Sequence, residues 1–416
     1  MAKFIVKGGK PLKGTVKVSG SKNAALPILC ASLLSKTPVT LTNVPDITDI
    51  HGMLKIFESL GASTSFNKGT VQIDASKLKK KQIPDALTCK MRASILVFGS
   101  LLPRLGEVKM AFPGGCVLGK RSVHTHTFAL KELGCKVLDE TRGLHIKVQK
   151  LKGKKIILPE LSVTGTENAI MAATLAAGTT EIHLAAAEPH VQDLCNFLNK
   201  MGAKINGIGT NTLKIKGVKA LKGTKYSITG DYLEAGTFAA AAVATKGEIT
   251  IEGIETDHLD SFWQKLTEIG ASYTLGKGQV TIHPSKSLNA TRLQTAVFPG
   301  FATDLQAPFT VLLTQAKGVS KVFETLFEGR LSYLFELEKM GAKTELLNPH
   351  QALIIGPRKL KAVPIASCDI RAGAAMVIAA LIASGETEIS NINYIDRGYE
   401  NLEKKLRSLG ADIQRV

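Results

Sequence analysis

The sequence of 416 residues lacks long hydrophobic runs, and only 5% of its residues are aromatic. No stretch approaches the ~20 apolar residues of a membrane-spanning helix. The first residues are too few and too polar for a signal peptide. Sparse aromatics argue against the base-stacking surfaces of proteins that bind single-stranded nucleic acids. We therefore expect neither a membrane span nor a nucleic-acid partner.

The six cysteines form no CxxC pair and show no metal-ligand spacing with histidines. Cys30 and Cys195 lie in apolar helical patterns and are predicted to be buried and reduced, which indicates a reducing, cytoplasmic compartment. His124 and His126 supply too few ligands for a metal site. The sequence also lacks a Walker A motif and a dinucleotide-binding fingerprint. We expect no metal and no cofactor.

The sequence has an excess of positive charge, with 53 Lys and Arg residues against 35 Asp and Glu residues. A net charge of +18 permits binding of nucleic acid, an anionic surface or an anionic substrate. Much of the excess lies in lysine runs at 77–81 and 150–155, which are typical of solvated turns. These runs contain no interleaved aromatic residues, so nucleic-acid binding is disfavoured, although a basic nucleic-acid binder is kept as an alternative.

A short pattern with a central glycine recurs along the whole chain. Its glycines lie 68 to 73 residues apart, at Gly61, Gly134, Gly202, Gly270, Gly341 and Gly410. Each glycine follows an amphipathic helical stretch, and a strand-like alternation follows most of them. The glycine is therefore predicted to end a helix and lead into a strand.

An alanine-rich helix is predicted upstream of each of these glycines, at residues 23–34, 91–102, 167–176, 233–245, 304–315 and 370–383. Such helices are apolar nearly all round, so they should be buried. One unit of this size cannot bury its central helix alone. Since 416 residues exceed the ~250–300 residues of a single core, six units should form two similar domains linked near Gly230. The first ~20 residues should close onto the C-terminal half.

A glycine-rich loop at 112–121 holds Cys116, with Lys120 and Arg121 a few residues downstream. Nearby positive charge favours a thiolate, which is one condition for a reactive cysteine. A plain turn with an inert small residue explains the loop composition equally well. The loop alone does not decide between the two.

The other polar residues of interest sit where the alanine-rich helices begin. Lys22, just after Ser19-Gly20-Ser21, indicates either an anion site at a helix start or a capped helix with a solvent-facing lysine. Asp304 is either a helix N-cap or a carboxylate general base. Arginines placed equivalently in the repeat could point at one shared centre, and they are Arg92, Arg371 and Arg397.

Seven segments together resemble the UDP-N-acetylglucosamine 1-carboxyvinyltransferases, the enolpyruvyl transferases of peptidoglycan synthesis. They span nearly the whole chain and are Ser19–Pro27, Met91–Ser94, Pro113–Cys116, Thr303–Gln306, Phe327–Arg330, Asp369–Ala372 and Asp396–Glu400. The resemblance implies an α/β fold with two similar inverse α/β-barrel domains, built from six repeated βαβαββ-like units. It places one domain at 22–229 and the other at 1–21 plus 230–416, with the active site between them.

The implied reaction transfers enolpyruvyl from phosphoenolpyruvate to the 3-hydroxyl of UDP-N-acetylglucosamine, with release of phosphate. The resemblance makes Cys116 the general acid, which fosfomycin reaches, and Asp304 the base. Implied catalytic residues are Cys116, Asp304, Lys22 and Arg397. Implied substrate contacts are Lys22, Asn23, Arg92, Arg121, Ser162, Val163, Asp304, Leu326, Arg330, Arg371 and Arg397.

Within that set, Lys22, Arg121 and Arg397 would hold the phosphate of phosphoenolpyruvate, and Arg330 and Arg371 its carboxylate, which suits a planar fork. Three positions depart from the family pattern. His124 replaces an aspartate that reads uracil, Ser21 replaces an alanine, and Gly329 replaces an asparagine. Two alternatives remain: an enolpyruvyl transferase acting on shikimate 3-phosphate, and a binding protein without turnover.

Overall fold

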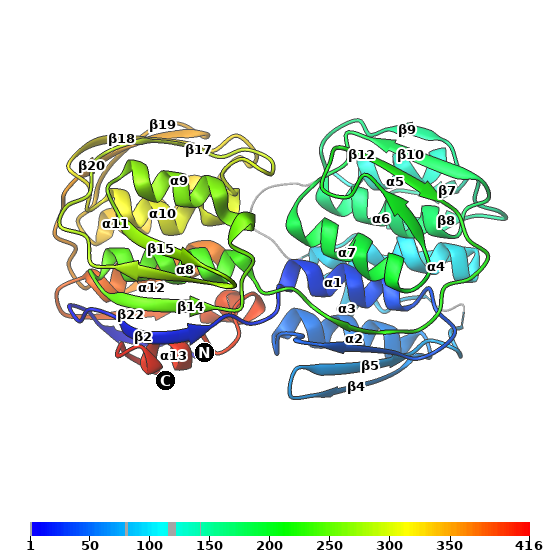
Figure 1. Ribbon diagram of the computed structural model, residues 1–416, viewed down its shortest axis with the longest axis horizontal. Coiled ribbons are helices and arrows are strands. Elements are labelled where there is room, and N and C mark those ends of the chain that lie inside the picture. The colour runs from blue at the N-terminus through cyan, green and yellow to red at the C-terminus, as the bar shows by residue number, and fades with distance from the viewer. Residues whose placement is uncertain (1, 80–81, 115–121, 142) are drawn as a thin grey trace. The chain divides into compact units, whose positions relative to one another are not determined.

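The computed structural model describes residues 2–79, 82–114, 122–141 and 143–416 (Figure 1). Within these ranges the chain divides into two compact units. Residues 20–229 are called the N-terminal unit. Residues up to Ser19, together with those from Gly230 onward, are called the C-terminal unit. Each unit is described by itself.

Each unit holds three inner helices, which are mostly buried, and three outer helices that bury one face. In the N-terminal unit the inner helices are α1 (Lys22–Ser32), α4 (Val97–Leu105) and α6 (Val163–Thr174), and the outer helices are α2 (Thr48–Ser59), α5 (His124–Glu132) and α7 (Pro189–Lys200). In the C-terminal unit the inner helices are α8 (Tyr232–Ala244), α10 (Gln306–Leu313) and α12 (Ile370–Ile382), and the outer helices are α9 (Asp260–Glu268), α11 (Leu334–Lys339) and α13 (Leu402–Ser408). The short helices are α3 (Asp85–Thr88), η1 (Arg92–Leu96), η2 (Thr256–Leu259), η3 (Thr303–Leu305), η4 (Arg330–Tyr333) and η5 (Ile392–Arg397).

The strands form three sheets in each unit, and those of the described ranges do not close into a barrel. The N-terminal unit has the orders β13-β3-β5-β4, β6-β8-β7 and β11-β12-β10-β9, built from β3 (Val39–Thr42), β4 (Ser63–Asn67), β5 (Thr70–Asp74), β6 (Glu107–Met110), β7 (Lys136–Asp139), β8 (Leu144–Lys147), β9 (Lys155–Ile157), β10 (Thr179–His183), β11 (Lys204–Asn206), β12 (Thr212–Lys216) and β13 (Lys225–Ser227). The C-terminal unit has the orders β21-β22-β1-β23, β15-β16-β14-β2 and β17-β18-β20-β19, built from β1 (Phe4–Lys7), β2 (Lys13–Lys17), β14 (Glu248–Glu252), β15 (Ser272–Gly276), β16 (Gln279–His283), β17 (Arg292–Gln294), β18 (Gly318–Phe323), β19 (Lys343–Asn348), β20 (Gln351–Gly356), β21 (Ile365–Ala366), β22 (Glu386–Ser390) and β23 (Asp412–Arg415).

The element order confirms the α/β class and the sixfold βαβαββ repeat. Five repeats are complete if the last one is closed by β1, which pairs antiparallel with both β22 and β23. The second repeat, around α4, has a three-stranded sheet and lacks its first strand in the described residues. Strand β2 pairs in parallel with β14, so the first residues close onto the C-terminal half as expected.

All six glycines of the recurring pattern lie two residues after the last residue of an outer helix and have a positive φ, between 84° and 105°. Residues with a Cβ rarely adopt this left-handed backbone, which explains why glycine recurs there. The predicted helix ends are therefore confirmed at the level of backbone conformation.

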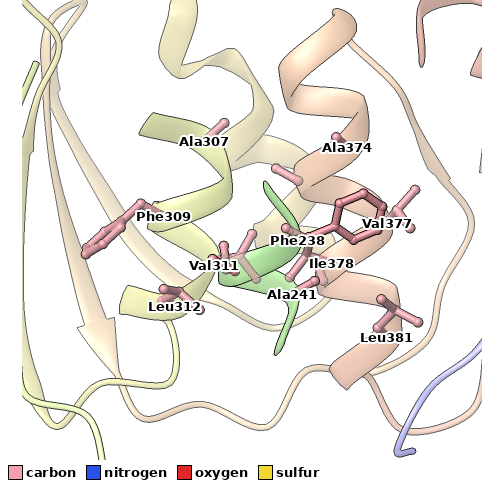
Figure 2. Close-up of a cluster of buried hydrophobic side chains, with 14 of the residues drawn as sticks. Phe238, Ala241, Ala307, Phe309, Val311, Leu312, Ala374, Val377, Ile378 and Leu381 are labelled. Carbon is pink, nitrogen blue, oxygen red and sulfur yellow. The ribbon is translucent and has the colours of Figure 1, made fainter. Parts of the chain in front are cut away.

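The inner helices pack through small residues, and Figure 2 shows this for α8, α10 and α12. Alanines such as Ala241 and Ala374 let the helices approach closely, and Phe238 and Ile378 fill space between them. Phe309 points away from the other two helices and packs on Phe262 of α9. Burial of each large side chain contributes about 1.5–3 kcal/mol. None of the helices in the described ranges is long and apolar enough to cross a membrane.

The helix predicted at 91–102 is two elements, η1 and α4, and Asn168 supplies the reason. The Gly99 N–H donates to Oδ1 of Asn168 (2.8 Å). Nδ2 of Asn168 donates to the carbonyl of Ile95 (3.0 Å). One side chain from α6 thus occupies the two backbone groups that would otherwise bond to each other, which is a known cause of helix irregularity.

Candidate active site

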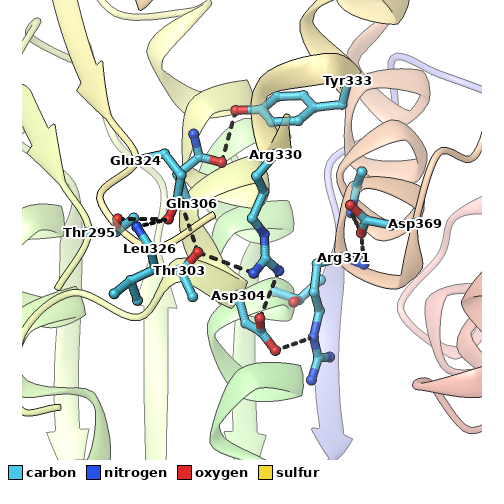
Figure 3. Close-up of polar contacts among 12 residues, drawn as sticks. Thr295, Thr303, Asp304, Gln306, Glu324, Leu326, Arg330, Tyr333, Asp369 and Arg371 are labelled. Carbon is cyan, nitrogen blue, oxygen red and sulfur yellow. Dashed lines mark hydrogen bonds and ion pairs between the residues drawn. The ribbon is translucent and has the colours of Figure 1, made fainter. Parts of the chain in front are cut away.

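Asp304, Arg330 and Arg371 come together in the C-terminal unit from η3, the start of η4 and the first turn of α12 (Figure 3). Oδ1 of Asp304 lies 2.7 Å from Nη2 of Arg330, and Oδ2 lies 3.1 Å from Nε of Arg371. Both arginine side chains are only 4% exposed. The sequence predicted these residues as substrate contacts; the structure also pairs them with one another.

The electrostatics of this cluster favour the ionised form of every member. Burial alone would raise the pKa of Asp304, but the charges of Arg330 and Arg371 outweigh it and hold that pKa well below the usual 3.8. Burial opposes the charge on Arg330, yet Asp304 and other nearby carboxylates raise its pKa. In this arrangement Asp304 is a weak base.

Glu324, the residue after β18, supports the cluster through Thr303. This fully buried carboxylate accepts hydrogen bonds from Thr295 Oγ1 (3.1 Å), Thr303 Oγ1 (2.7 Å) and the Leu326 N–H (2.9 Å). Thr303 in turn accepts from Nη1 of Arg330 (3.1 Å). The guanidinium of Arg330 is therefore held through two of its nitrogens (Figure 3).

Arg371 is oriented by its own helix start and by an aromatic ring. Asp369 caps α12 by accepting from the N–H groups of Arg371 (2.7 Å) and Ala372 (2.8 Å). The guanidinium carbon of Arg371 lies 5.0 Å from the ring centre of Tyr399. Its Nη1 is buried and makes no hydrogen bond in the described structure. A buried donor without an acceptor is costly, so this nitrogen marks a place where an anion would bind favourably.

Lys22 and Asp49 form a buried ion pair in the N-terminal unit. Nζ of Lys22 lies 2.9 Å from Oδ2 of Asp49, and the two side chains are 9% and 7% exposed. Ser21 caps α1 by accepting from the Ala24 N–H (3.4 Å). The helix is capped as the second interpretation expected, but the lysine does not face the solvent, so that part of the interpretation is wrong. Asn23 follows at the start of α1 and is partly exposed.

The start of α6 brings several predicted residues near α5. Ser162 caps α6 by accepting from the Gly165 N–H (3.2 Å), and Val163 is the first helical residue. His126 is buried and bonded to Asn168 Nδ2 (2.8 Å, at Nδ1) and to Thr164 Oγ1 (3.2 Å, at Nε2). Burial and the charge of Arg92 lower the pKa of His126 to about 3. This ring is a neutral structural link between α5 and α6.

The other predicted residues in the described part of the chain are not part of the Asp304 cluster or of the Lys22–Asp49 pair. Nη2 of Arg92 donates to the Ser122 carbonyl (2.6 Å). Arg397 ends η5 and is partly exposed, while Leu326 is 39% exposed. His124 lies exposed at the first position of α5. Cys116 and Arg121, and most of the loop 112–121, lie outside the described residues.

One prediction is wrong and some partners were missed. Asp304 does not cap a helix, because it lies inside η3, where Ala302 holds the cap position. Sequence reasoning missed Asp49 and Glu324, which hold Lys22 and Thr303. The place of Asp49 in the first turn of α2 was a weak indication that it has a structural role. For Glu324 there was no indication in the sequence beyond its place at a strand end. The described residues contain no group of three or more His, Cys, Asp or Glu that could hold a metal ion.

Comparisons with known proteins give one family. The model of the family described as EPSP synthase (3-phosphoshikimate 1-carboxyvinyltransferase) matches residues 6–406. The chain is 45% identical over 416 residues to UDP-N-acetylglucosamine 1-carboxyvinyltransferase of Lawsonia intracellularis, covering 100% of both chains. It is 44% identical over 413 residues to UDP-N-acetylglucosamine 1-carboxyvinyltransferase 1 of Caldanaerobacter subterraneus subsp. tengcongensis, covering 99% of both.

Two solved structures share the fold. The enolpyruvyl transferase NikO from Streptomyces tendae superposes with a TM-score of 0.90 at 24% identity, covering 100% of this chain and 99% of that one. EPSP synthase from Acinetobacter baumannii gives a TM-score of 0.76 at 19% identity, covering 100% of both chains. At these identities the likeness supports the fold alone. Because the family model and the two relatives span nearly all of its residues, the chain belongs to the EPSP synthase family.

Proposed function

We propose that this enzyme transfers the enolpyruvyl group of phosphoenolpyruvate to the 3-hydroxyl of UDP-N-acetylglucosamine and releases phosphate. This reaction is the first committed step of peptidoglycan precursor synthesis and so serves the cell wall. The observation that carries the proposal is identity of 43–45% over the whole chain to relatives that bear the name of this activity.

The anion-binding features of the C-terminal unit support a substrate with a carboxylate. Arg330 and Arg371 bind the carboxylate of phosphoenolpyruvate, and Nη1 of Arg371, which is buried without an acceptor, donates to it. Lys22, Arg121 and Arg397 bind the phosphate, with Arg92 supporting them. Asn23 and Asp304 contact the sugar, and Ser162 and Val163 meet the UDP phosphates. Leu326 is a further substrate contact.

The reaction is an addition followed by an elimination. Asp304 accepts the proton of the 3-hydroxyl as its oxygen bonds to C2 of phosphoenolpyruvate, and Cys116 delivers a proton to C3. The bond from C2 to the phosphate oxygen then breaks, and C3 loses a proton to restore the double bond. When substrate takes donors from Arg330 and Arg371, the pKa of Asp304 rises toward its ordinary value, so the carboxylate becomes a stronger base.

The proposal includes two domains, 22–229 and 1–21 plus 230–416, both of which supply substrate ligands, and fosfomycin as an inhibitor at Cys116. It includes a cytoplasmic location, in line with five free cysteines in the described part of the chain. Neither a cofactor nor nucleic acid takes part.

Phosphate release by the purified chain tests the proposal. We expect release only when phosphoenolpyruvate and UDP-N-acetylglucosamine are both present, with an enolpyruvyl adduct of the sugar nucleotide seen by mass spectrometry. Release with shikimate 3-phosphate, and none with the UDP-sugar, would support the alternative acceptor. Unaltered phosphoenolpyruvate with either acceptor would support a binding protein without turnover.

A further inference from the structure

Four polar residues of the C-terminal unit form a network around Ser19, here called the Ser19 network: Ser19, Glu234, Glu400 and Lys405. The Ser19 hydroxyl donates to Oε2 of Glu400 and accepts from Nζ of Lys405 (2.7 Å). The Ser19 N–H donates to Oε2 of Glu234 (2.7 Å). Lys405 also donates to Oε1 of Glu234 (2.6 Å). Each member thus contacts at least one other within hydrogen-bond distance.

Burial makes this network costly to break. The Glu234 side chain is 3% exposed and that of Lys405 is 19% exposed. Burial raises the pKa of Glu234, while the charge of Lys405 and the Ser19 N–H oppose that rise. A buried carboxylate of this kind needs its partners, because an uncompensated charge in the interior is strongly unfavourable.

The network holds a segment that carries a proposed phosphate ligand. Glu400 lies three residues after Arg397, and Tyr399 lies between them. The Tyr399 hydroxyl is 2.8 Å from Thr237 Oγ1, on the same helix as Glu234, and its ring lies beside Arg371. On the other side of Arg397, Asp396 binds Arg415 at 2.6 and 3.0 Å.

The Ser19 network joins this segment to the N-terminal residues of the chain. Ser19 ends the first stretch of the C-terminal unit, and its carbonyl accepts from the Asp231 N–H (2.9 Å). Asp231 caps α8, which carries Glu234 and Thr237. The hydroxyl of Ser19 therefore connects the start of α8 to the chain just after Arg397, through Glu400.

We propose that the Ser19 network is a positioning device for Arg397, in which the Ser19 hydroxyl, through Glu400, sets where that arginine meets the phosphate of the substrate. Ser19, Glu234, Glu400 and Lys405 are positioning residues and do not touch the substrate. This inference rests on the proposed function for the role of Arg397.

Direct binding of phosphoenolpyruvate, measured by calorimetry, tests the proposal without requiring turnover. Ser19→Ala removes the hydroxyl but leaves the Lys405–Glu234 ion pair, so the protein should still fold. We expect the Kd for phosphoenolpyruvate to rise about tenfold, the order of effect of one lost hydrogen bond to a charged group. Ser19→Thr, which keeps a hydroxyl, should restore most of the affinity. Ser408→Ala is the matched control, since that exposed hydroxyl donates to the Lys405 carbonyl (2.7 Å) and lies outside the Ser19 network.

A double-mutant cycle separates positioning from general destabilisation. If Ser19 acts through Arg397, Ser19→Ala added to Arg397→Lys should weaken binding no further. Additive losses, or a Kd of Ser19→Ala within twofold of the unaltered protein, would overturn the proposal. Lys405→Met provides a second test, with exposed Lys404→Met as its control. Phosphate release by the unaltered protein with UDP-N-acetylglucosamine is measured in a separate assay. A negative result there would contradict the proposed acceptor but would leave the binding test of the Ser19 network valid.

Discussion

Oδ1 of Asp304 lies 2.7 Å from Nη2 of Arg330, and this contact joins two residues with separate proposed roles. Asp304 is the proposed base, and Arg330 is a proposed ligand of the carboxylate of phosphoenolpyruvate. With no substrate bound, each satisfies the other, so neither charge is buried alone. Under the proposed function, the substrate carboxylate takes the unpaired Nη1 of Arg371 and competes with Asp304 for Arg330. The proposed base and the substrate therefore share the two arginines.

Asp304→Asn should lower the free energy of unfolding by about 3 kcal/mol at pH 7, because the buried Arg330 and Arg371 would lose their carboxylate. The folded pKa of Asp304 is lowered, so its stabilisation is complete above the unfolded value near 3.8 and is lost as the pH falls below it. Urea unfolding at several pH values should therefore show a constant difference between the two proteins above about pH 4 and a shrinking difference as the pH falls further. A difference that stays constant below that pH would contradict this, and exposed Asp257→Asn serves as control.

Arg371→Lys should raise the KM for phosphoenolpyruvate at least tenfold. Arg371 contacts Asp304 through Nε, stacks its planar guanidinium on Tyr399 and keeps Nη1 for the substrate. Lysine is a point charge and cannot make all three contacts. The KM for the UDP-sugar should change little. Steady-state kinetics on both substrates test this, beside Arg407→Lys on the exposed side of α13. Equal changes in both KM values would argue for a general structural defect.

Cys116→Ser should abolish turnover and covalent labelling by fosfomycin, whereas Cys116→Asp should keep turnover, because a carboxylic acid can also donate a proton. Phosphate release and intact-protein mass spectrometry measure the two effects. Cys89→Ser is the control, since Cys89 is an exposed thiol of the same unit. Labelling that persists in Cys116→Ser would place the reactive thiol elsewhere.

Local patterns were enough to predict the repeat. A glycine with positive φ, an apolar helix and an alternating strand each depend on neighbours in the chain, so spacing located all six units. Arg371 was predicted from its place in the repeat, whereas Arg330 followed from the family resemblance. The partners of these charges could not be predicted, because Asp49 and Glu324 reach Lys22 and Thr303 only through packing of separate segments. The split of the second inner helix was equally hidden, since it depends on Asn168, 69 residues from Gly99 in sequence.

His126 should make stability fall on mild acidification. Its folded pKa is lowered to about 3 from the ordinary 6.5, so the unfolded chain gains a proton that the folded chain does not. Stability is then lost progressively from pH 6.5 down to about pH 3, by up to about 1.4 kcal/mol per pH unit. His126→Gln should remove this dependence. Imidazole NMR tests it directly: the His126 ring should stay neutral at pH 5 when folded and be protonated in urea.

Gly99→Ala should destabilise the protein by about 1–3 kcal/mol, because an added Cβ would lie within 2.7–2.9 Å of the Oδ1, carbonyl oxygen and Cα of Asn168. Two of these atoms are backbone and cannot move away alone, and the third is bonded to the Gly99 N–H. Gly52→Ala on α2 is the matched control: its Cβ would meet only the side-chain end of Met91, which can rotate. There the gain in helix propensity, up to about 1 kcal/mol, should offset the crowding. Thermal and urea unfolding of both variants measure the difference. Equal losses would mean that the contact between α4 and α6 tolerates a methyl group, and that the insertion of Asn168 does not require glycine at position 99.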